Sequence, residues 1–335
     1  MRIAVDAMGG DHAPREIIRG VLLGLEKVPD IEITLFGIED RIKAELSGAE
    51  LDDPRISIEH CSQAIEMSES PVEALRHKRD SSISRIAVAA AKHEVDAIIS
   101  AGNTGAFAAA CHLSRIGTLP GVARPGIAVT LPTFHGPVVV CDVGANVAPK
   151  PRHLYEYAHM SVCYAQAILG IKSPRVGLVS IGEEANKGNS LTREARVLIE
   201  QDGRLDFVGN VEGRDIFASD CDVFICDGFV GNVVLKLTEG LAEGIFKTLR
   251  KEIAEESAEL ADQFEPVVAR IWQKHDYSEY GGAPLLGVNS VVIICHGRSD
   301  RRAIANAIRV AAEQIRLKLN AAISDHLSKP VEGGA

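Results

Sequence analysis

Two hydrophobic patterns alternate along the chain and predict an α/β protein. Short runs rich in Val and Ile stand between longer segments with helical spacing of apolar residues, which is typical of a mostly parallel sheet covered by helices. Several runs are apolar on both faces, as buried parallel strands are. The expected strands are residues 2–6, 31–36, 56–59, 97–100, 138–143, 176–181, 223–226 and 291–295.

Glycine and small polar residues cluster in the loops that follow these strands. The loops read MGGDHAP from Met8, AGNTGA from Ala101, CDVGANV from Cys141, GEEANKGNS from Gly182, DGFVGN from Asp227 and HGRSDRR from His296. Loops at the opposite strand ends, such as LEKVPDIE and KHEVDA, are plainer. Ligands of open α/β sheets bind outside the carboxyl ends of strands, where glycine lets the backbone approach and helix starts favour anions. The asymmetry predicts an anion site, although turns and helix caps explain any one loop.

Length and composition narrow the class of protein. A chain of 335 residues fits one large α/β unit over residues 1–330, with two lobes around a cleft, a boundary that the pattern does not fix, and a short flexible tail at 331–335. A net charge of −10 argues against general nucleic-acid binding, which needs a basic face. The amino terminus does not resemble a signal peptide, and no apolar stretch is long enough to span a bilayer. Seven scattered cysteines without a CxxC pair indicate reduced core residues of a cytoplasmic protein.

Missing motifs argue against several enzyme classes. The chain has no GxGxxG, GxxxxGK[ST], GxSxG or HExxH sequence, so an ordinary nicotinamide enzyme, kinase or serine hydrolase loses support. Two charged residues remain as candidates for chemistry. Lys187 lies between glycines and could neutralise a phosphate or an oxyanion, or it is a solvated loop lysine. Asp227 follows an apolar strand and could be a general acid or base, a helix cap, or both.

Other polar residues on the same loops are weaker candidates. Amides and hydroxyls next to glycine offer hydrogen bonds to phosphate or carbonyl oxygens, and neutral imidazoles can donate as well, although a structural role is the usual one for each. The residues are Asn103 with Thr104, Asp142 with Asn146, His12 and His296. Asp6, Asp11 and Asp142 would suggest Mg²⁺, but no dense carboxylate cluster appears, so we expect no metal.

At these loops the sequence resembles the bacterial phosphate acyltransferase family of phospholipid synthesis, also called acyl-acyl carrier protein:phosphate acyltransferase. The resemblance rests on segments that cover nearly the whole chain in order. They are RIAVDAMGGDHAP from Arg2, SAGNTGA from Ser100, DVGAN from Asp142, GEEANKGN from Gly182, CDGFVGNVVLK from Cys226, GGAPLLGVN from Gly281 and CHGRS from Cys295.

The resemblance implies a three-layer α/β/α fold similar to phosphotransacetylase and isopropylmalate dehydrogenase. It implies an acyltransferase that makes acyl phosphate from long-chain acyl carrier protein and inorganic phosphate, with no cofactor, as a first step toward phosphatidic acid. Lys187 and Asp227 match the positions expected to be catalytic. The expected substrate-binding residues are Asp6, Gly9, Gly10, His12, Gly102, Asn103, Thr104, Gly105, Asp142, Gly144, Asn146, Asn189, Gly228, Asn232 and His296.

The resemblance also implies partners. It implies a homodimer, and a membrane glycerol-3-phosphate acyltransferase is a candidate recipient of the product. An acidic carrier protein needs a basic patch, for which the segments 76–79 and 247–251 are candidates, with a solvated helix face as the default reading. The amphipathic stretch 241–272 predicts packing on a core or a dimer partner, with peripheral membrane contact as a second use.

Two rival functions stay open. A dehydrogenase of the isopropylmalate type would share the fold but need a metal and a nicotinamide site. A non-catalytic scaffold would bind acyl carrier protein without phosphate-dependent release of thiol.

Overall fold

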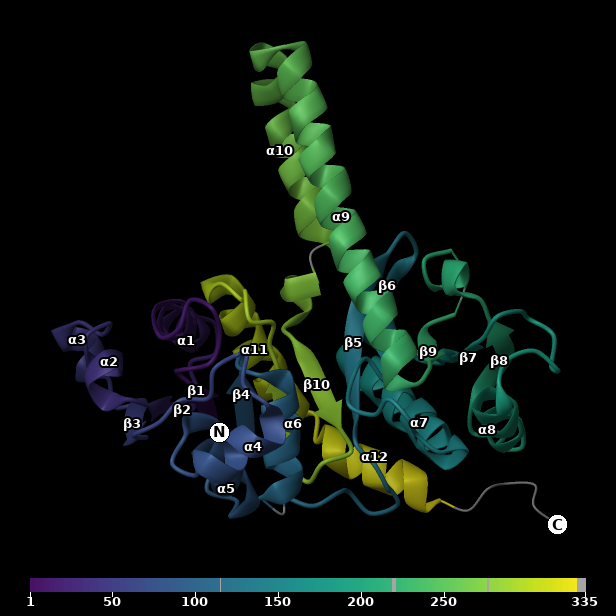
Figure 1. Cartoon of the computed structure of the whole chain (residues 1–335), viewed down its shortest axis with the longest axis horizontal. Coiled ribbons are helices and arrows are strands. Elements are labelled where there is room, and N and C mark those ends of the chain that lie inside the picture. The colour runs from purple at the N-terminus through teal and green to yellow at the C-terminus, as the bar shows by residue number, and fades with distance from the viewer. Residues whose placement is uncertain (115, 219–220, 276, 330–335) are drawn as a thin grey trace.

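Within the described residues, eleven strands form one sheet that runs through the molecule (Figure 1). The computed structural model describes residues 1–114, 116–218, 221–275 and 277–329. The strand order is β3-β2-β1-β4-β11-β10-β5-β6-β9-β7-β8. The strands are β1 (Arg2–Asp6), β2 (Glu32–Gly37), β3 (Ile56–His60), β4 (Ala97–Ser100), β5 (Gly126–Thr133), β6 (Gly136–Cys141), β7 (Arg175–Val179), β8 (Asp206–Val211), β9 (Val223–Ile225), β10 (Ala283–Leu286) and β11 (Val291–Ile294).

The strands form two parallel groups that run in opposite directions. One group is β3, β2, β1, β4 and β11, and the other is β6, β9, β7 and β8. Strands β10 and β5 join them through antiparallel pairings with each other and with their outer neighbours. The predicted mostly parallel sheet is confirmed, and all eight expected strands are present. Strands β5, β8 and β10 were not predicted.

Helices cover both faces of the sheet. They are α1 (Arg15–Lys27), α2 (Glu39–Lys43), α3 (Gly48–Leu51), α4 (Pro71–His77), α5 (Ser82–Ala91), α6 (Thr104–Leu113), α7 (Pro151–Ile168), α8 (Ser190–Glu200), α9 (Gly228–Glu256), α10 (Ala258–His275), α11 (Arg301–Arg316) and α12 (Leu319–Ser328). Short 3₁₀ turns lie at Gly213–Ile216 and Tyr277–Tyr280. Most of these helices connect strands, as in other α/β folds.

Alternate side chains of each strand enter opposite core layers, because successive residues of a strand point to opposite faces. In β1, Ile3 packs in the same cluster as Ile308 of α11, whereas the adjacent Ala4 belongs to the cluster of Ile86 in α5. In β6, Val139 packs with Tyr157 of α7. One face carries a single apolar cluster across the sheet, and the other carries two. The predicted three-layer architecture follows from this arrangement.

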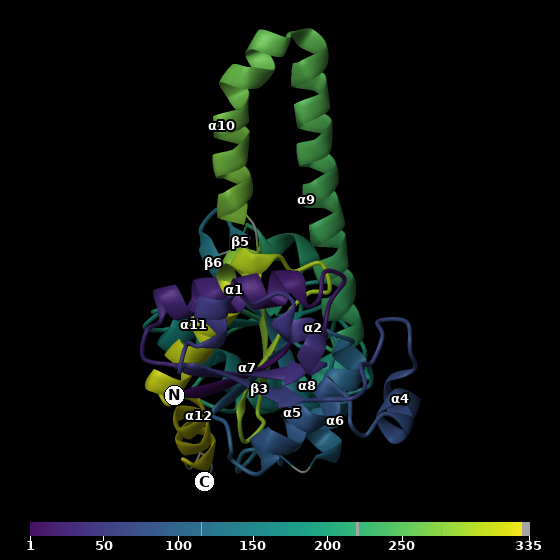
Figure 2. The same ribbon diagram turned by 90° about the vertical axis from the view of Figure 1, so that its left-hand side faces the viewer.

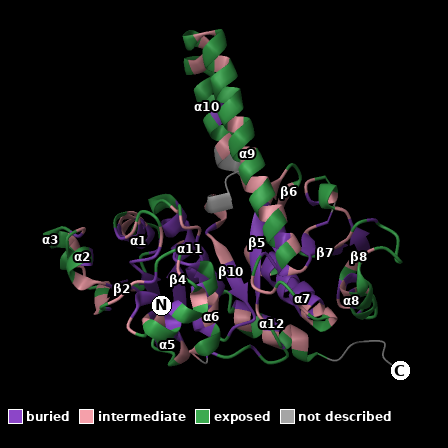
Figure 3. Cartoon of the chain, in the orientation of Figure 1, coloured by how far each residue is buried: buried purple, intermediate pink, exposed green. Residues whose placement is uncertain are grey.

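Helices α9 and α10 form a hairpin that extends away from the sheet (Figures 1 and 2). Its surface is largely exposed (Figure 3), including Leu241 at 59% and Ile245 at 56% relative exposure. The prediction that this amphipathic stretch packs on the chain's own core is therefore wrong for these residues. The alternative, packing against a dimer partner, stays a prediction.

Seven buried free cysteines confirm the prediction of reduced core thiols. Burial raises the pKa of Cys61 to about 12, so this thiol stays protonated at neutral pH. Along the described parts of the chain, no helix is both long and apolar enough to cross a membrane. The flexible tail predicted at 331–335 lies outside the described residues.

Candidate functional site

A cleft of about 370 Å³ lies where two helix starts meet the central antiparallel strands. Ile127 of β5 and Ala283 of β10 line it, together with Thr104 at the start of α6 and Gly228 at the start of α9. The first N–H groups of a helix have no helical acceptor and carry partial positive charge. The partial positive charge of two helix starts at one cleft favours an anion, in keeping with the site predicted from the loops.

Several residues predicted to bind substrate line this cleft, and they come from the loops or helix starts that follow four different strands, β4, β6, β9 and β11. They are Thr104, Gly105, Gly144, Gly228, Asn232 and His296. The topology thus brings together segments that are separated by almost two hundred residues in the sequence. Their contribution to binding stays a prediction.

Asn103 shapes the start of α6. Its side-chain oxygen accepts the Ala106 N–H at 3.0 Å, which makes it the helix cap. Among the hydrogen bonds found within the described residues, the N–H groups of Thr104 and Gly105 have no protein acceptor. These two amides are therefore available to a ligand in the cleft, while Asn103 itself has a structural role.

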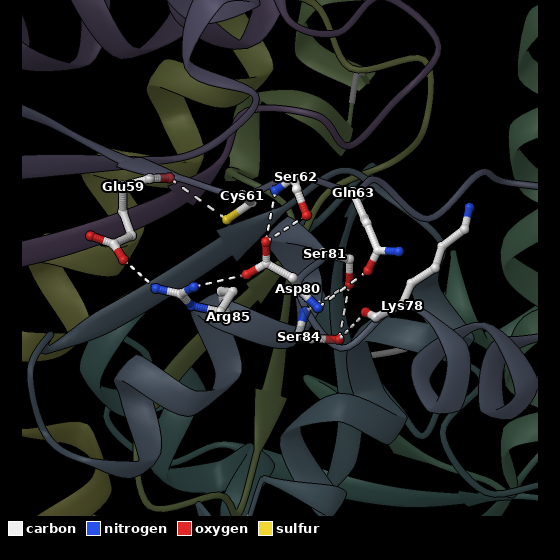
Figure 4. Close-up of polar contacts among 9 residues, drawn as sticks. All are labelled: Glu59, Cys61, Ser62, Gln63, Lys78, Asp80, Ser81, Ser84 and Arg85. Carbon is white, nitrogen blue, oxygen red and sulfur yellow. Dashed lines mark hydrogen bonds and ion pairs between the residues drawn. The ribbon is translucent and has the colours of Figure 1, made fainter.

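The loop after β3 holds the Asn103 side chain in place by hydrogen bonds. The Asn103 side-chain amide donates to the carbonyl oxygens of Met67 at 3.2 Å and Glu69 at 3.0 Å. This loop is itself fastened to α5, because Asp80 accepts hydrogen bonds from the backbone and hydroxyl of Ser62 and from Arg85 (Figure 4). The Ser62 hydrogen bonds, followed by Arg85, lower the pKa of Asp80 to about 2. The polar cluster in Figure 4 therefore holds one side of the cleft in place.

Asp227 caps α9 on the opposite side. Its Oδ1 accepts the N–H groups of Phe229 at 3.0 Å and Val230 at 2.9 Å. The Gly228 N–H donates to the Asn146 carbonyl at 2.8 Å, so the first amides of α9 have protein partners. The helix start lies directly on this loop, since a Cβ on Gly231 would come within 1.9 Å of the Asp142 carbonyl oxygen. Only glycine fits there.

Asp142 organises the loop after β6. The fully buried carboxylate accepts N–H groups from Ile127, Gly144, Ala145 and Asn146 at 2.7 to 3.1 Å. Burial raises its pKa, and these four hydrogen bonds oppose that rise. Its role in the structure is to tie the loop to β5 rather than to face the cleft.

Asn146, a second predicted residue on this loop, also has structural partners. Its side-chain amide donates to the Pro125 carbonyl and to the Tyr157 hydroxyl, at 2.7 and 2.8 Å. Asp142 and Asn146 therefore position the loop that presents Gly144 to the cleft.

Asp6 plays a similar part beneath the loops after β1 and β4. The buried carboxylate accepts the Ser100 hydroxyl at 2.7 Å, and burial raises its pKa. A Cβ on Gly9 would lie 2.5 Å from Asp6 Oδ2 and 2.6 Å from the Gly102 nitrogen, so these two loops touch at their backbones. Gly10 follows with a positive φ of 107°. These residues hold the loops together and do not line the cleft.

Lys187, Asn189 and His12 are exposed and lie outside the lining of the cleft. Asn189 caps α8 by accepting the Thr192 N–H at 2.9 Å. Lys187 lies on the loop after β7, which is separated from β6 by β9 alone. The three strands are parallel, so the loops with Lys187, Asp227 and Asp142 leave the same edge of the sheet, with roughly 5 Å between neighbouring strands.

Two charged residues of the cleft were not predicted. Lys236 and Glu239 line it from the third and fourth turns of α9, and their charged groups lie 2.8 Å apart. Their spacing of three residues on an expected helix was the available signal. Across the cleft, His296 Nδ1 accepts the Arg298 N–H at 3.1 Å. Burial and then the Lys236 charge lower the pKa of His296, which favours a neutral ring with its proton on Nε2.

Asp11, weighed with Asp6 and Asp142 as a metal ligand, is exposed on the loop after β1, whereas the other two carboxylates are buried. Over residues 1–114, 116–218, 221–275 and 277–329, no group of three or more His, Cys, Asp or Glu side chains is arranged to hold a metal ion.

Comparisons with known proteins give one consistent result. A family model described as "Fatty acid synthesis protein" matches residues 1–322. The phosphate acyltransferase of Halothermothrix orenii is 47% identical over 337 residues, which cover 99% of this chain and all of that protein. The phosphate acyltransferase of Desulfitobacterium hafniense strain DCB-2 is 48% identical over 316 residues, 93% of each chain.

Comparison with solved structures shows which proteins share this fold. A phosphotransacetylase from Streptococcus pyogenes superposes with a TM-score of 0.62 at 18% identity, over 94% of each chain. A branched-chain phosphotransacylase from Enterococcus faecalis gives 0.59 at 16% identity, over 93% of this chain and 99% of that one. At these identities the likeness shows a shared fold, and it confirms the predicted similarity to phosphotransacetylase.

Proposed function

Because the chain belongs to the phosphate acyltransferase family, we propose that it transfers a long-chain acyl group from acyl carrier protein to inorganic phosphate. The observation that carries the proposal is the match to relatives of that name over nearly the whole length of both chains. The product, an acyl phosphate, is the activated acyl donor for phospholipid synthesis. We further propose that the sheet divides into two lobes at β10 and β5, with the cleft at their junction.

Inorganic phosphate binds between the starts of α6 and α9 in this proposal. The unpartnered amides of Thr104 and Gly105, the side-chain amide of Asn232 and the neutral His296 ring supply donors without a metal. Lys236 lines the same cleft as a charged donor, and its partner there is Glu239 at 2.8 Å. Amide and charged donors in a partly enclosed site stabilise an anion more strongly than they do in water.

The reaction is a direct displacement at the thioester carbonyl. An oxygen of HPO₄²⁻ attacks the acyl carbon and forms a tetrahedral oxyanion, which collapses with cleavage of the C–S bond. The phosphate proton goes to the leaving sulfur, so the products are acyl phosphate and the free thiol. No covalent enzyme intermediate is needed. We propose that Lys187 offsets charge on the oxyanion and that Asp227 orients phosphate or relays the proton.

The test of the activity is phosphate dependence. We expect the protein to release free thiol from hexadecanoyl-acyl carrier protein with phosphate present and not without it, with one acyl phosphate formed per thiol. Carrier binding without this release would favour the scaffold function instead. Turnover that requires a nicotinamide cofactor and Mg²⁺ would favour a dehydrogenase.

Asp227 needs a test that separates chemistry from helix capping. Asparagine caps a helix about as well as aspartate, whereas alanine loses about 1 kcal/mol. We expect Asp227→Asn to keep the wild-type unfolding free energy and to lose most of kcat. We expect Asp227→Ala to lower both the unfolding free energy and kcat. Full activity in Asp227→Asn would show that this residue only caps the helix.

For the exposed Lys187, we expect Lys187→Ala to lower kcat about 100-fold with unchanged stability.

For the carrier protein we propose the basic side chains near Lys247 as the docking patch. Lys247 and Arg250 line a cleft of about 850 Å³ that also includes His296, and Arg250 pairs with Glu265 at 2.9 Å. The other candidate patch holds Lys78, which pairs with Glu69 at 2.6 Å. We expect Lys247→Glu to raise KM for the acyl carrier several-fold and leave KM for phosphate unchanged. An unchanged carrier KM would refute this patch.

We also propose a cytoplasmic homodimer with peripheral membrane contact. Several large apolar side chains are exposed along the α9–α10 hairpin, and a group of this kind is typical of a protein or membrane contact. They include Leu241, Ile245, Leu249, Phe264 and Val267. Sedimentation at increasing concentration tests the dimer, and flotation with liposomes tests the membrane contact. A strict monomer, or an absence of flotation, would remove the corresponding proposal. Transfer of the product to a membrane glycerol-3-phosphate acyltransferase belongs to the same proposal.

A further inference from the structure

A second hollow, of about 430 Å³, lies at the base of the α9–α10 hairpin, and we call it the apolar groove. Leu131 and Phe134 of the β5–β6 hairpin line it, with Leu241 and Ile245 of α9 and Trp272 of α10. Among the described residues that line it, all but two threonines and one glutamate are apolar. A hollow of this size and composition is typical of sites for small apolar ligands.

The groove adjoins the cleft of about 370 Å³ in which we propose that phosphate binds, and which we call the phosphate cleft. Leu235 and Glu239 of α9 line both hollows, so an apolar path starts at the place where the anion is expected to bind. The lining residues at its outer part stay open to solvent: Leu237 is 67% exposed and Leu241 is 59% exposed. Apolar surface of this extent needs an occupant.

The phosphate cleft also adjoins a hollow that is lined by charged side chains rather than apolar ones. The cleft of about 850 Å³ shares Lys236, Glu239 and His296 with it. It adds charged side chains of both signs, which are Lys247, Arg250, Arg298, Glu243 and Asp300. Glu239 lines all three hollows and therefore marks the point where they meet.

An aromatic pair separates the two outer hollows. Phe246 and Trp272 line both of them, with ring centroids 5.0 Å apart in an edge-to-face contact. One route from the phosphate cleft is thus lined by apolar side chains and the other by charged ones, and two aromatic rings lie between them.

We propose that the apolar groove holds the acyl chain of the thioester substrate, with the thioester near Leu235 and Glu239. The inference rests on the proposed function. A long-chain acyl carrier has two branches at its reacting carbon, an apolar chain and an arm that leads to an acidic protein. The two routes match these branches in polarity and meet at the phosphate cleft. The groove therefore selects chain length and aims the carbonyl at phosphate.

The first test measures chain-length preference. Each buried methylene contributes about fourfold to binding, so kcat/KM should rise steeply from octanoyl to hexadecanoyl carrier until the groove is full. Leu241→Trp fills the groove from an exposed position. We expect it to lower kcat/KM for the hexadecanoyl substrate at least about 10-fold and to leave the octanoyl substrate within about twofold of wild type.

Leu249→Trp is the matched control, because Leu249 lies two turns further along α9, is also exposed and does not line the groove. It should keep the wild-type ratio of hexadecanoyl to octanoyl activity. If both variants change that ratio equally, the effect comes from the outer hairpin surface, as a dimer or membrane contact would produce, and the groove assignment is overturned. Parallel loss for every chain length in Leu241→Trp also overturns it.

A second test does not depend on catalysis. Trp272 is the only tryptophan in the chain, so all tryptophan emission comes from the wall of the groove. We expect 9,10-dibromohexadecanoate to quench this emission and octanoate not to compete with it. Leu241→Asp should weaken the quenching at least about 10-fold, and Leu249→Asp should not.

The two readouts separate the inference from the function on which it rests. Quenching in the groove without phosphate-dependent release of thiol would refute the acyltransferase proposal while supporting an acyl site. Normal turnover with no quenching and no chain-length preference would leave the function standing and refute the groove.

Discussion

Gly231→Ala tests the contact between the start of α9 and the loop after β6. The new Cβ would lie 1.9 Å from the Asp142 carbonyl oxygen and 2.9 Å from its carbonyl carbon. Cβ atoms do not approach other heavy atoms closer than 3.0 Å, so the two backbones must separate by roughly 1 Å. That movement would weaken the 2.8 Å hydrogen bond from the Gly228 N–H to the Asn146 carbonyl.

The expected cost follows from the size of this displacement. Overpacking in a well-packed region lowers stability by about 1–3 kcal/mol, and a displacement of about 1 Å near a reacting group can lower turnover about 100-fold. We therefore expect Gly231→Ala to melt a few degrees lower than wild type and to lose about two orders of magnitude in kcat/KM. Calorimetry and the thiol-release assay measure the two effects.

Gly244→Ala is the control on the same helix. No atom lies within 4 Å of a Cβ built there, so alanine should raise the stability by about 1 kcal/mol through its higher helix propensity. The two glycine substitutions thus have opposite predicted signs. A Gly231→Ala protein with wild-type melting temperature and turnover would refute the close approach of α9 to Asp142.

Three further predictions concern buried polar groups. Asp142→Asn replaces a carboxylate that accepts four N–H groups, and should lower the unfolding free energy by about 2–3 kcal/mol in denaturant titrations. Asn103→Ala should lower stability by about 1 kcal/mol and raise KM for phosphate. Burial lowers the pKa of His159 to about 4, so the unfolded chain binds the extra proton below about pH 6.5 and stability falls as the pH falls. His159→Gln should reduce this slope between pH 6.5 and 4.5 by up to about 1.4 kcal/mol per pH unit, and an unchanged slope would contradict the assignment.

Local sequence patterns were sufficient to predict the parallel strands and the loops that follow them. The reason is that buried parallel strands are short apolar runs, and the loops combine glycine with capping residues, so each signal lies within a few residues. The strands that form the centre of the sheet were missed. Strand β10 has four residues with a proline, β5 has a proline next to its last residue, and neither shows a regular alternation.

The missed strands decide where the site lies. Because β5 and β10 reverse the direction of the sheet, the carboxyl ends of its two halves do not share one continuous edge, and the cleft forms where the starts of α6 and α9 meet these central strands. Leu285 of β10 pairs with Ile127 of β5 across more than 150 residues of sequence. No local pattern contains that pairing, since it depends on the order of strands in the folded sheet.

The same reasoning divides the candidate residues by role. Asp6, Asn103, Asp142 and Asn146 were selected because polar residues next to glycine suit an anion, and the structure shows each of them bound to the protein's own backbone. Such residues shape a site without facing it, since a buried carboxylate or amide must have its hydrogen bonds satisfied. Lys236, in contrast, lies within a long helix and was not among the predicted site residues. Its position becomes significant only because the start of α9 packs on the Asp142 loop, which brings the next turns of the helix to the cleft.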